Sequence, residues 1–123
     1  MRSTRILLGL ALSVFSTLTV AGLKINYPVS IGPGQASGSL SSVRSSSNAN
    51  ELIACTVSPT TLLCVAEDAS GTFVYCFADA KARADLAEIA RSVNSASYLL
   101  FQWDTSSRTC TNIEVTNGSY LLP

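Results

Sequence analysis

The sequence predicts a small α+β domain that contains a mostly antiparallel sheet in the order β-β-β-α-β-β, one covering helix and disulfide bonds. Short runs rich in β-branched and aromatic residues recur from position 51 onward, and turn residues separate them. Between them, residues 79–94 carry apolar residues at helical spacing. Four cysteines and no histidine among 123 residues add the disulfides to this prediction.

Residues 1–21 are typical of a secretory signal peptide. Arg2 and Arg5 give a positive start, residues 6–20 are mainly apolar, and small residues lead up to Ala21, the expected cleavage point. The apolar stretch is shorter than the about 20 residues that a membrane-spanning helix needs. We therefore expect a secreted or periplasmic protein that has no membrane anchor after cleavage and whose cysteines are oxidised.

Residues 22–50 differ in composition from the rest of the chain. From Pro28 onward serine, glycine and proline dominate, and large apolar residues are few. Because such a segment has little apolar surface to bury, we expect a mobile arm or linker. The short run 23–27 alternates apolar and polar residues and is a candidate edge strand. The folded core is then expected to span residues 51–123.

The first part of this core predicts a meander of three strands. They are residues 51–57, 61–67 and 72–78. A four-residue loop at 58–61 places Cys55 opposite Cys64, and a turn centred on Ser70 places Cys64 opposite Cys76. The three cysteines then share one apolar face, which we expect to lie beneath the helix.

A helix and a second hairpin are expected next. Asp79 is a candidate N-cap, and Asn94 is a natural stop. The apolar residues at helical spacing, which we expect to be buried, are Leu86, Ile89, Ala90 and Val93. Residues 98–103 and 109–116 predict two strands joined through the turn at 104–107.

Four cysteines allow three disulfide pairings. Cys55 and Cys76 would lie two strands apart, about 10 Å, which is beyond the roughly 7 Å that a disulfide spans. This argues against Cys55–Cys76 with Cys64–Cys110. We favour Cys55–Cys64 with Cys76–Cys110, in which the second bond closes a long loop, and Cys55–Cys110 with Cys64–Cys76 stays open.

The last cysteine conflicts with a regular strand. Cys110 is out of phase with Ile113 and Val115, so in an uninterrupted strand its side chain points away from the apolar side. Either a bulge near Thr109 or a strand that starts later would remove the conflict.

Composition and motifs argue against several functions. Arg2 and Arg5 leave with the leader, so six scattered basic residues remain against eight acidic ones, which does not favour nucleic-acid binding. The cysteine spacing contains no C-x-x-C pair and no histidine is present, so we expect no metal site and no cofactor. A serine or cysteine nucleophile lacks a histidine base, and phosphate-binding glycine motifs are absent. We therefore expect a protein that is not an enzyme.

Candidate binding residues lie on the face of the meander opposite the cysteines. Phe73, Tyr75 and Phe77 alternate along one strand and form an aromatic row. We favour burial of the row beneath the second hairpin or the arm, and the alternative is an exposed strip that binds a sugar or a protein. Tyr98 and Trp103 are further candidates.

Three function classes follow, in order of preference. The first is a secreted binding domain for an extracellular protein or carbohydrate. The second is an inhibitor of a secreted hydrolase, acting through a protruding loop at 58–61 or 104–108. The third is a small hydrolase that uses paired carboxylates, such as Glu67 with Asp68 or Asp85 with Glu88, although turns and solvated helix faces explain these residues more simply.

Overall fold

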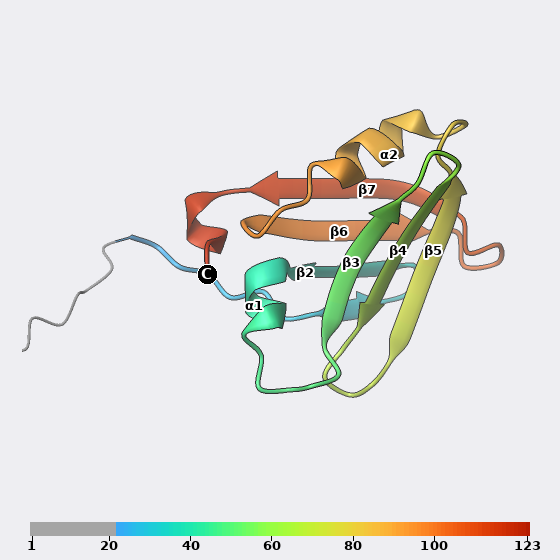
Figure 1. Ribbon diagram of the computed structural model, residues 1–123. Coiled ribbons are helices and arrows are strands. Elements are labelled where there is room, and N and C mark those ends of the chain that lie inside the picture. Colours follow the sequence, from blue (N-terminus) through green and yellow to red (C-terminus); the bar gives the residue numbers. More distant parts are fainter. Residues whose placement is uncertain (1–21) are drawn as a thin grey trace, which may run out of the picture.

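The computed structural model describes residues 22–123, and the predicted signal peptide lies outside this range. Within the described residues, seven strands form two antiparallel sheets, accompanied by two α-helices and one short 3₁₀ helix (Figure 1). The predicted α+β class with two disulfides is confirmed. Neither helix of this part of the chain has the length and apolar character that crossing a membrane requires.

The strands divide between a four-stranded and a three-stranded sheet. The four-stranded sheet has the order β1 (Ser30–Gly32), β2 (Gln35–Ser39), β6 (Ser97–Trp103) and β7 (Cys110–Asn117). The three-stranded sheet has the order β3 (Leu52–Val57), β4 (Thr61–Glu67) and β5 (Phe73–Asp79). The helices are α1 (Leu40–Arg44), α2 (Ala84–Arg91) and the 3₁₀ helix η1 (Ser119–Leu121).

The prediction that residues 22–50 form an arm or linker was wrong. This segment supplies β1, β2 and α1, and β2 pairs with β6 from Gln35↔Gln102 to Ser39↔Tyr98. The expected edge strand at 23–27 is also absent from the described chain, whose first strand begins at Ser30. Because Val29, Ala36 and Val43 belong to the hydrophobic core, the folded core does not start at residue 51.

Small residues explain why composition was misleading here. β2 is buried at four of its five positions although its sequence is Gln-Ala-Ser-Gly-Ser. A Cβ on Gly38 would lie 3.4 Å from the Cα of Val29, so the preceding backbone passes close over this strand. The Ser39 amide donates to the carbonyl of Tyr27 in the same segment. The shortage of large apolar residues therefore reflects close packing of backbone against backbone.

The predicted register of the three-stranded sheet is confirmed. Cys55 lies opposite Cys64, and Cys64 lies opposite Cys76. The favoured disulfide pairing is confirmed as well, since Cys55 bonds to Cys64 and Cys76 to Cys110. The first bond joins neighbouring strands of one sheet, and the second joins β5 to β7 of the other sheet.

A bulge resolves the conflict at Cys110. Gln102 pairs with Asn112, but the next residue, Trp103, pairs with Cys110, so Thr111 is an extra residue in β7. Cys110 and Ile113 are consequently both buried. The bulge lies two residues later than the expected position near Thr109.

The helix differs from the prediction in its start and in its buried face. Asp79 accepts hydrogen bonds from the amides of Lys81 and Ala82, so it caps a turn that precedes α2. Leu86, Ala87 and Ala90 are the buried residues of the helix, whereas Ile89 is 38% exposed. α2 packs against β7 and β3, and small alanines let it approach them closely.

The hydrophobic core lies between the two sheets. The cysteine face of the three-stranded sheet packs against residues of the four-stranded sheet as well as against α2, and so the helix is not its only cover. Residues from both sheets in this core include Leu62, Cys64, Val74, Cys76, Leu99, Phe101 and Ile113.

Candidate functional site

The outer face of the three-stranded sheet carries the predicted aromatic row. Along β5, buried and exposed residues alternate, and Val74, Cys76 and Ala78 point into the core. The other three are solvent-exposed, Phe73 by 52%, Tyr75 by 39% and Phe77 by 46%. The favoured expectation that the row is buried was therefore wrong, and the alternative of an exposed strip is observed.

Neighbouring side chains enlarge the row into an apolar patch. The register of β4 with β5 places Leu63 beside Phe77 and Val65 beside Tyr75. Leu63 is 38% exposed and Val65 is half-buried. We define the aromatic face as Phe73, Tyr75, Phe77, Leu63 and Val65. All five residues belong to two adjacent strands, β4 and β5, which run side by side in Figure 1.

A cation lies at the border of the aromatic face. The guanidinium carbon of Arg108 lies 5.2 Å from the centroid of the Tyr75 ring, within the range of a cation–π contact. The peptide N–H of Phe77 donates to the carbonyl of Arg108 at 3.0 Å, and Phe77 forms a parallel bridge with Thr109. The β6–β7 loop is therefore fastened to the edge of β5.

Asp104 organises the loop that presents Arg108. Its carboxylate accepts hydrogen bonds from the Ser106 hydroxyl at 2.5 Å and from the amides of Ser106 and Ser107 at 2.9 and 3.1 Å. These bonds favour the charged form and lower the pKa of Asp104. Arg108 itself adopts the left-handed conformation with φ of 61°, and its amide donates to the carbonyl of Asp104 at 2.8 Å.

The remaining two predicted binding residues lie elsewhere. Trp103 is only 8% exposed and packs against Phe101, with 5.6 Å between the ring centroids, so it belongs to the core. Tyr98 is half-buried, contacts Tyr27 edge to face at 5.0 Å, and lines a cavity of about 300 Å³ that is also formed by Thr116 and Tyr120. The structure therefore brings together three of the five predicted residues.

One member of each acidic pair considered for hydrolysis, Asp85 or Asp68, makes local structural contacts. The Arg83 guanidinium donates to both carboxylate oxygens of Asp85 at 3.0 and 3.1 Å, and this lowers the pKa of Asp85. Asp68 accepts from the hydroxyl of Ser70 and the amide of Thr72 in the β4–β5 turn, and these bonds lower its pKa. Both carboxylates are held in the charged form, the opposite of what a general acid needs.

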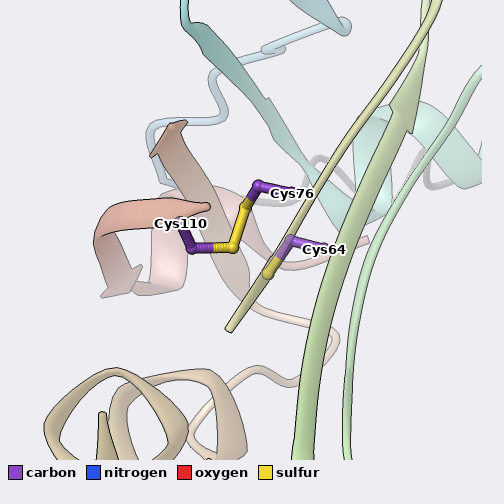
Figure 2. Close-up of side chains that lie close together, drawn as sticks. All are labelled: Cys64, Cys76 and Cys110. Atoms are coloured by element: carbon purple, nitrogen blue, oxygen red, sulfur yellow. A yellow bond between two sulfur atoms is a disulfide. The ribbon is translucent and has the colours of Figure 1, made fainter. Parts of the chain in front are cut away.

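The predicted cysteine residues form a compact sulfur cluster. The Sγ atoms of Cys64, Cys76 and Cys110 lie within 4.8 Å of one another (Figure 2), and all three cysteines are buried. Each of these sulfurs is bonded in a disulfide, so none of them is the thiolate that a zinc ion binds. The cluster is the packing of two disulfides side by side, and it stiffens the sheet from its buried side.

A second concave surface was not predicted from the sequence. A groove of about 980 Å³ lies between α1, β3 and the chain end, and it is lined by apolar groups such as Val43 and Ile53 and by serine hydroxyls. Arg44 is the basic residue of this lining, and the carboxylate of Glu51 already accepts from the Val29 amide. The sequence carried no signal for this groove because α1 was expected to belong to a mobile arm.

Comparisons with protein-family models, with curated proteins and with solved structures found no match to this chain.

Proposed function

We propose that this protein is a secreted or periplasmic binding domain that docks another protein on its aromatic face. One observation carries the proposal, namely that three aromatic side chains in one row are each between 39% and 52% exposed. Large apolar patches are uncommon on monomeric soluble proteins and mark interaction surfaces. The two disulfides are compatible with an oxidising compartment outside the cytoplasm.

The composition of the face favours a protein over a carbohydrate. Aromatic residues and arginine are enriched at the centres of protein interfaces, and here Arg108 stacks over Tyr75 beside the two phenylalanines. A sugar site needs hydrogen-bonding groups that orient the hydroxyls of the ligand. Two of the three β4 neighbours of the row, Leu63 and Val65, offer none from their side chains, and the third, Glu67, lies opposite Phe73 at the start of β5.

The rigidity of the face supports the same proposal. Both disulfides lie on the buried side of the sheet that carries the aromatic row. On the same side of β4 and β5, four small residues are buried, namely Cys64, Ala66, Cys76 and Ala78. A face that is already fixed loses little conformational entropy when it binds. The loop at 104–108, by contrast, folds back onto β5, which gives little support to an inhibitor that inserts this loop into a target.

Site-specific photo-crosslinking tests the proposal. A benzophenone amino acid replaces Leu63 at the centre of the face, and in a matched control it replaces Glu88 on the exposed side of α2. Irradiation of the producing cells and their medium is expected to give a discrete protein adduct from position 63 alone. Adding Tyr75→Ser to the protein that carries the crosslinker at position 63 should abolish this adduct. The melting temperature should stay nearly unchanged, because the Tyr75 ring is substantially exposed.

Two outcomes would count against docking of a protein. The first is identical adducts from positions 63 and 88, or an adduct at 63 that survives Tyr75→Ser. The second is binding to one glycan of an array that Tyr75→Ser abolishes, which would make the ligand a carbohydrate.

A further inference from the structure

The backbone N–H and C=O groups of β5 point alternately toward β4 and toward the open edge of the sheet. In an antiparallel ladder, successive residues direct their N–H and C=O groups alternately toward one side of the strand and the other. At the two ends of the β4–β5 pair, the Asp68 amide donates to the Thr72 carbonyl and the Ala80 amide to the Thr60 carbonyl. Even-numbered residues of β5 therefore face β4. The backbone groups of Phe73, Tyr75 and Phe77 point away from it.

One end of this edge is already paired by the chain itself. The Phe77 N–H donates to Arg108, and the bridge between Phe77 and Thr109 is parallel. Among the hydrogen bonds of residues 22–123, none outside the sheet ladder involves the backbone of Phe73 or Tyr75. The open edge thus begins where the Arg108–Thr109 segment ends.

The open edge and the aromatic face belong to the same residues. Phe73 and Tyr75 present their unpaired backbone groups sideways and their rings outward, so one ligand is able to contact both. Unpaired edge strands are usually shielded, since their free N–H and C=O groups template the addition of another strand. Here only the Phe77 end is shielded.

Arg108 at this edge has no ion-pair partner among the described residues. Arg108 lies over Tyr75, and no carboxylate of residues 22–123 lies within 4.0 Å of its guanidinium, the single ion pair of this part of the chain being Arg83–Asp85. A partner with an acidic side chain at this point would complement the charge.

The size of the face matches an extended segment better than a broad globular surface. Two strands about 4.8 Å apart and seven residues of about 3.3 Å each cover roughly 10 by 23 Å. A stable interface between globular proteins buries about 800 Å² on each partner, which is more than this face offers. A peptide that adds as a strand gains main-chain hydrogen bonds in addition to side-chain contacts.

We propose that the edge of β5 binds an extended segment of a partner protein as an added strand. The segment pairs with Phe73 and Tyr75, continues the strand pairing that Arg108 and Thr109 begin, lays alternate apolar side chains over the aromatic face, and places an acidic side chain at Arg108. This inference rests on the proposed function and names the kind of partner that the face takes.

Peptide selection supplies the probe for a test. A library of random 12-residue peptides is displayed on phage and selected on the full mature protein, and the enriched peptides are synthesised. We expect peptides with alternating apolar residues and at least one Asp or Glu. On addition of such a peptide, amide hydrogen exchange at Phe73 and Tyr75 should slow about tenfold or more, because both amides become hydrogen-bonded.

The charge is tested by Arg108→Asn. Asparagine tolerates the left-handed backbone at this position, so the loop is retained. The affinity for an acidic peptide should fall about threefold to tenfold, and it should not change for the same peptide with the acid replaced by its amide. Arg91→Asn, at an exposed position of α2, is the matched control and should bind both peptides like the wild type.

Two results would overturn strand addition without touching the proposed function. One is a selected peptide that shifts the aromatic resonances while the exchange of both amides stays unchanged, since the ligand then contacts only side chains. The other is the absence of any enriched peptide in a protein that still gives the position-63 crosslink. Loss of that crosslink would instead overturn the proposed function.

Discussion

Cys76 of β5 and Cys110 of β7 are joined by a disulfide that crosses from one sheet to the other. The bond fastens the strand that carries the aromatic row to the four-stranded sheet, and both cysteines are fully buried. It forms because the bulge at Thr111 turns Cys110 toward the core. The presentation of the aromatic face therefore depends on a residue in a different sheet.

The two disulfides should differ in their contributions to stability. Cys76→Ala with Cys110→Ala opens a loop of 34 residues and should lower the free energy of unfolding by about 4 kcal/mol. Cys55→Ala with Cys64→Ala opens a loop of 9 residues and should cost about 2.5 kcal/mol. Urea denaturation of both double variants measures the difference. A larger loss of unfolding free energy in the Cys55→Ala with Cys64→Ala variant would contradict this prediction.

The buried face of α2 is testable with two matched substitutions. Leu86 is 3% exposed, so Leu86→Ala should lower the free energy of unfolding by about 2 to 5 kcal/mol. Ile89 is 38% exposed, so Ile89→Ala should lower the free energy of unfolding by less than about 1 kcal/mol. Thermal and urea unfolding give both values. Equal losses would mean that the helix is rotated from its observed position.

Two glycines in the first hairpin should respond differently to alanine. Gly34 has φ of +67°, and a Cβ there would lie 3.1 Å from the carbonyl oxygen of Trp103. Gly34→Ala should therefore destabilise by about 1 to 3 kcal/mol. Gly32→Ala meets nothing within 4 Å and should stay within about 0.5 kcal/mol of the wild type. A neutral Gly34→Ala would indicate that β1 and β2 are not docked on β6.

Asp104 should make stability depend on pH in the acid range. Its folded-state pKa is lowered from the ordinary 3.8 by hydrogen bonds from Ser106 and Ser107, so its stabilising contribution is present above 3.8 and is lost as the pH falls through the folded-state pKa. Asp104→Asn should be less stable than the wild type at about pH 7, and the difference between their free energies of unfolding should narrow on acidification. Urea midpoints across the pH range check this, with Glu88→Gln as a control. A constant gap would contradict it.

Local patterns were sufficient for the meander and its disulfides. Alternation of apolar residues and short turns placed Cys55, Cys64 and Cys76 on one face in the observed register. The distance between Cys55 and Cys76, two strands apart, removed one of the three possible disulfide pairings. Of the other two, the favoured pairing is the one present. These predictions succeeded because neighbouring strands joined by tight turns interact over a short stretch of chain, where spacing and register are closely linked.

The errors lie where partners are distant in sequence. β2 pairs with β6, which lies far along the chain, from Gln35↔Gln102 to Ser39↔Tyr98, and nothing in the run Gln-Ala-Ser-Gly-Ser marks such a partner. Helical periodicity showed an apolar side on α2, but whether Ile89 or Ala87 faced inward depended on the strands against which the helix packs. The same holds for the loop at Arg108, whose contact with Tyr75 no local pattern indicates.

The amino-acid order alone was enough to identify an α+β chain with two disulfides and a row of three aromatic residues opposite the cysteines, because strand alternation is a local property of the backbone. Tertiary structure decided whether that row was covered. The segment 28–50 and the second hairpin, either of which would have buried it, instead pair with each other through β2 and β6 on the other side of the core. Phe73, Tyr75 and Phe77 stay exposed because the apolar surface of both segments is already used in the four-stranded sheet.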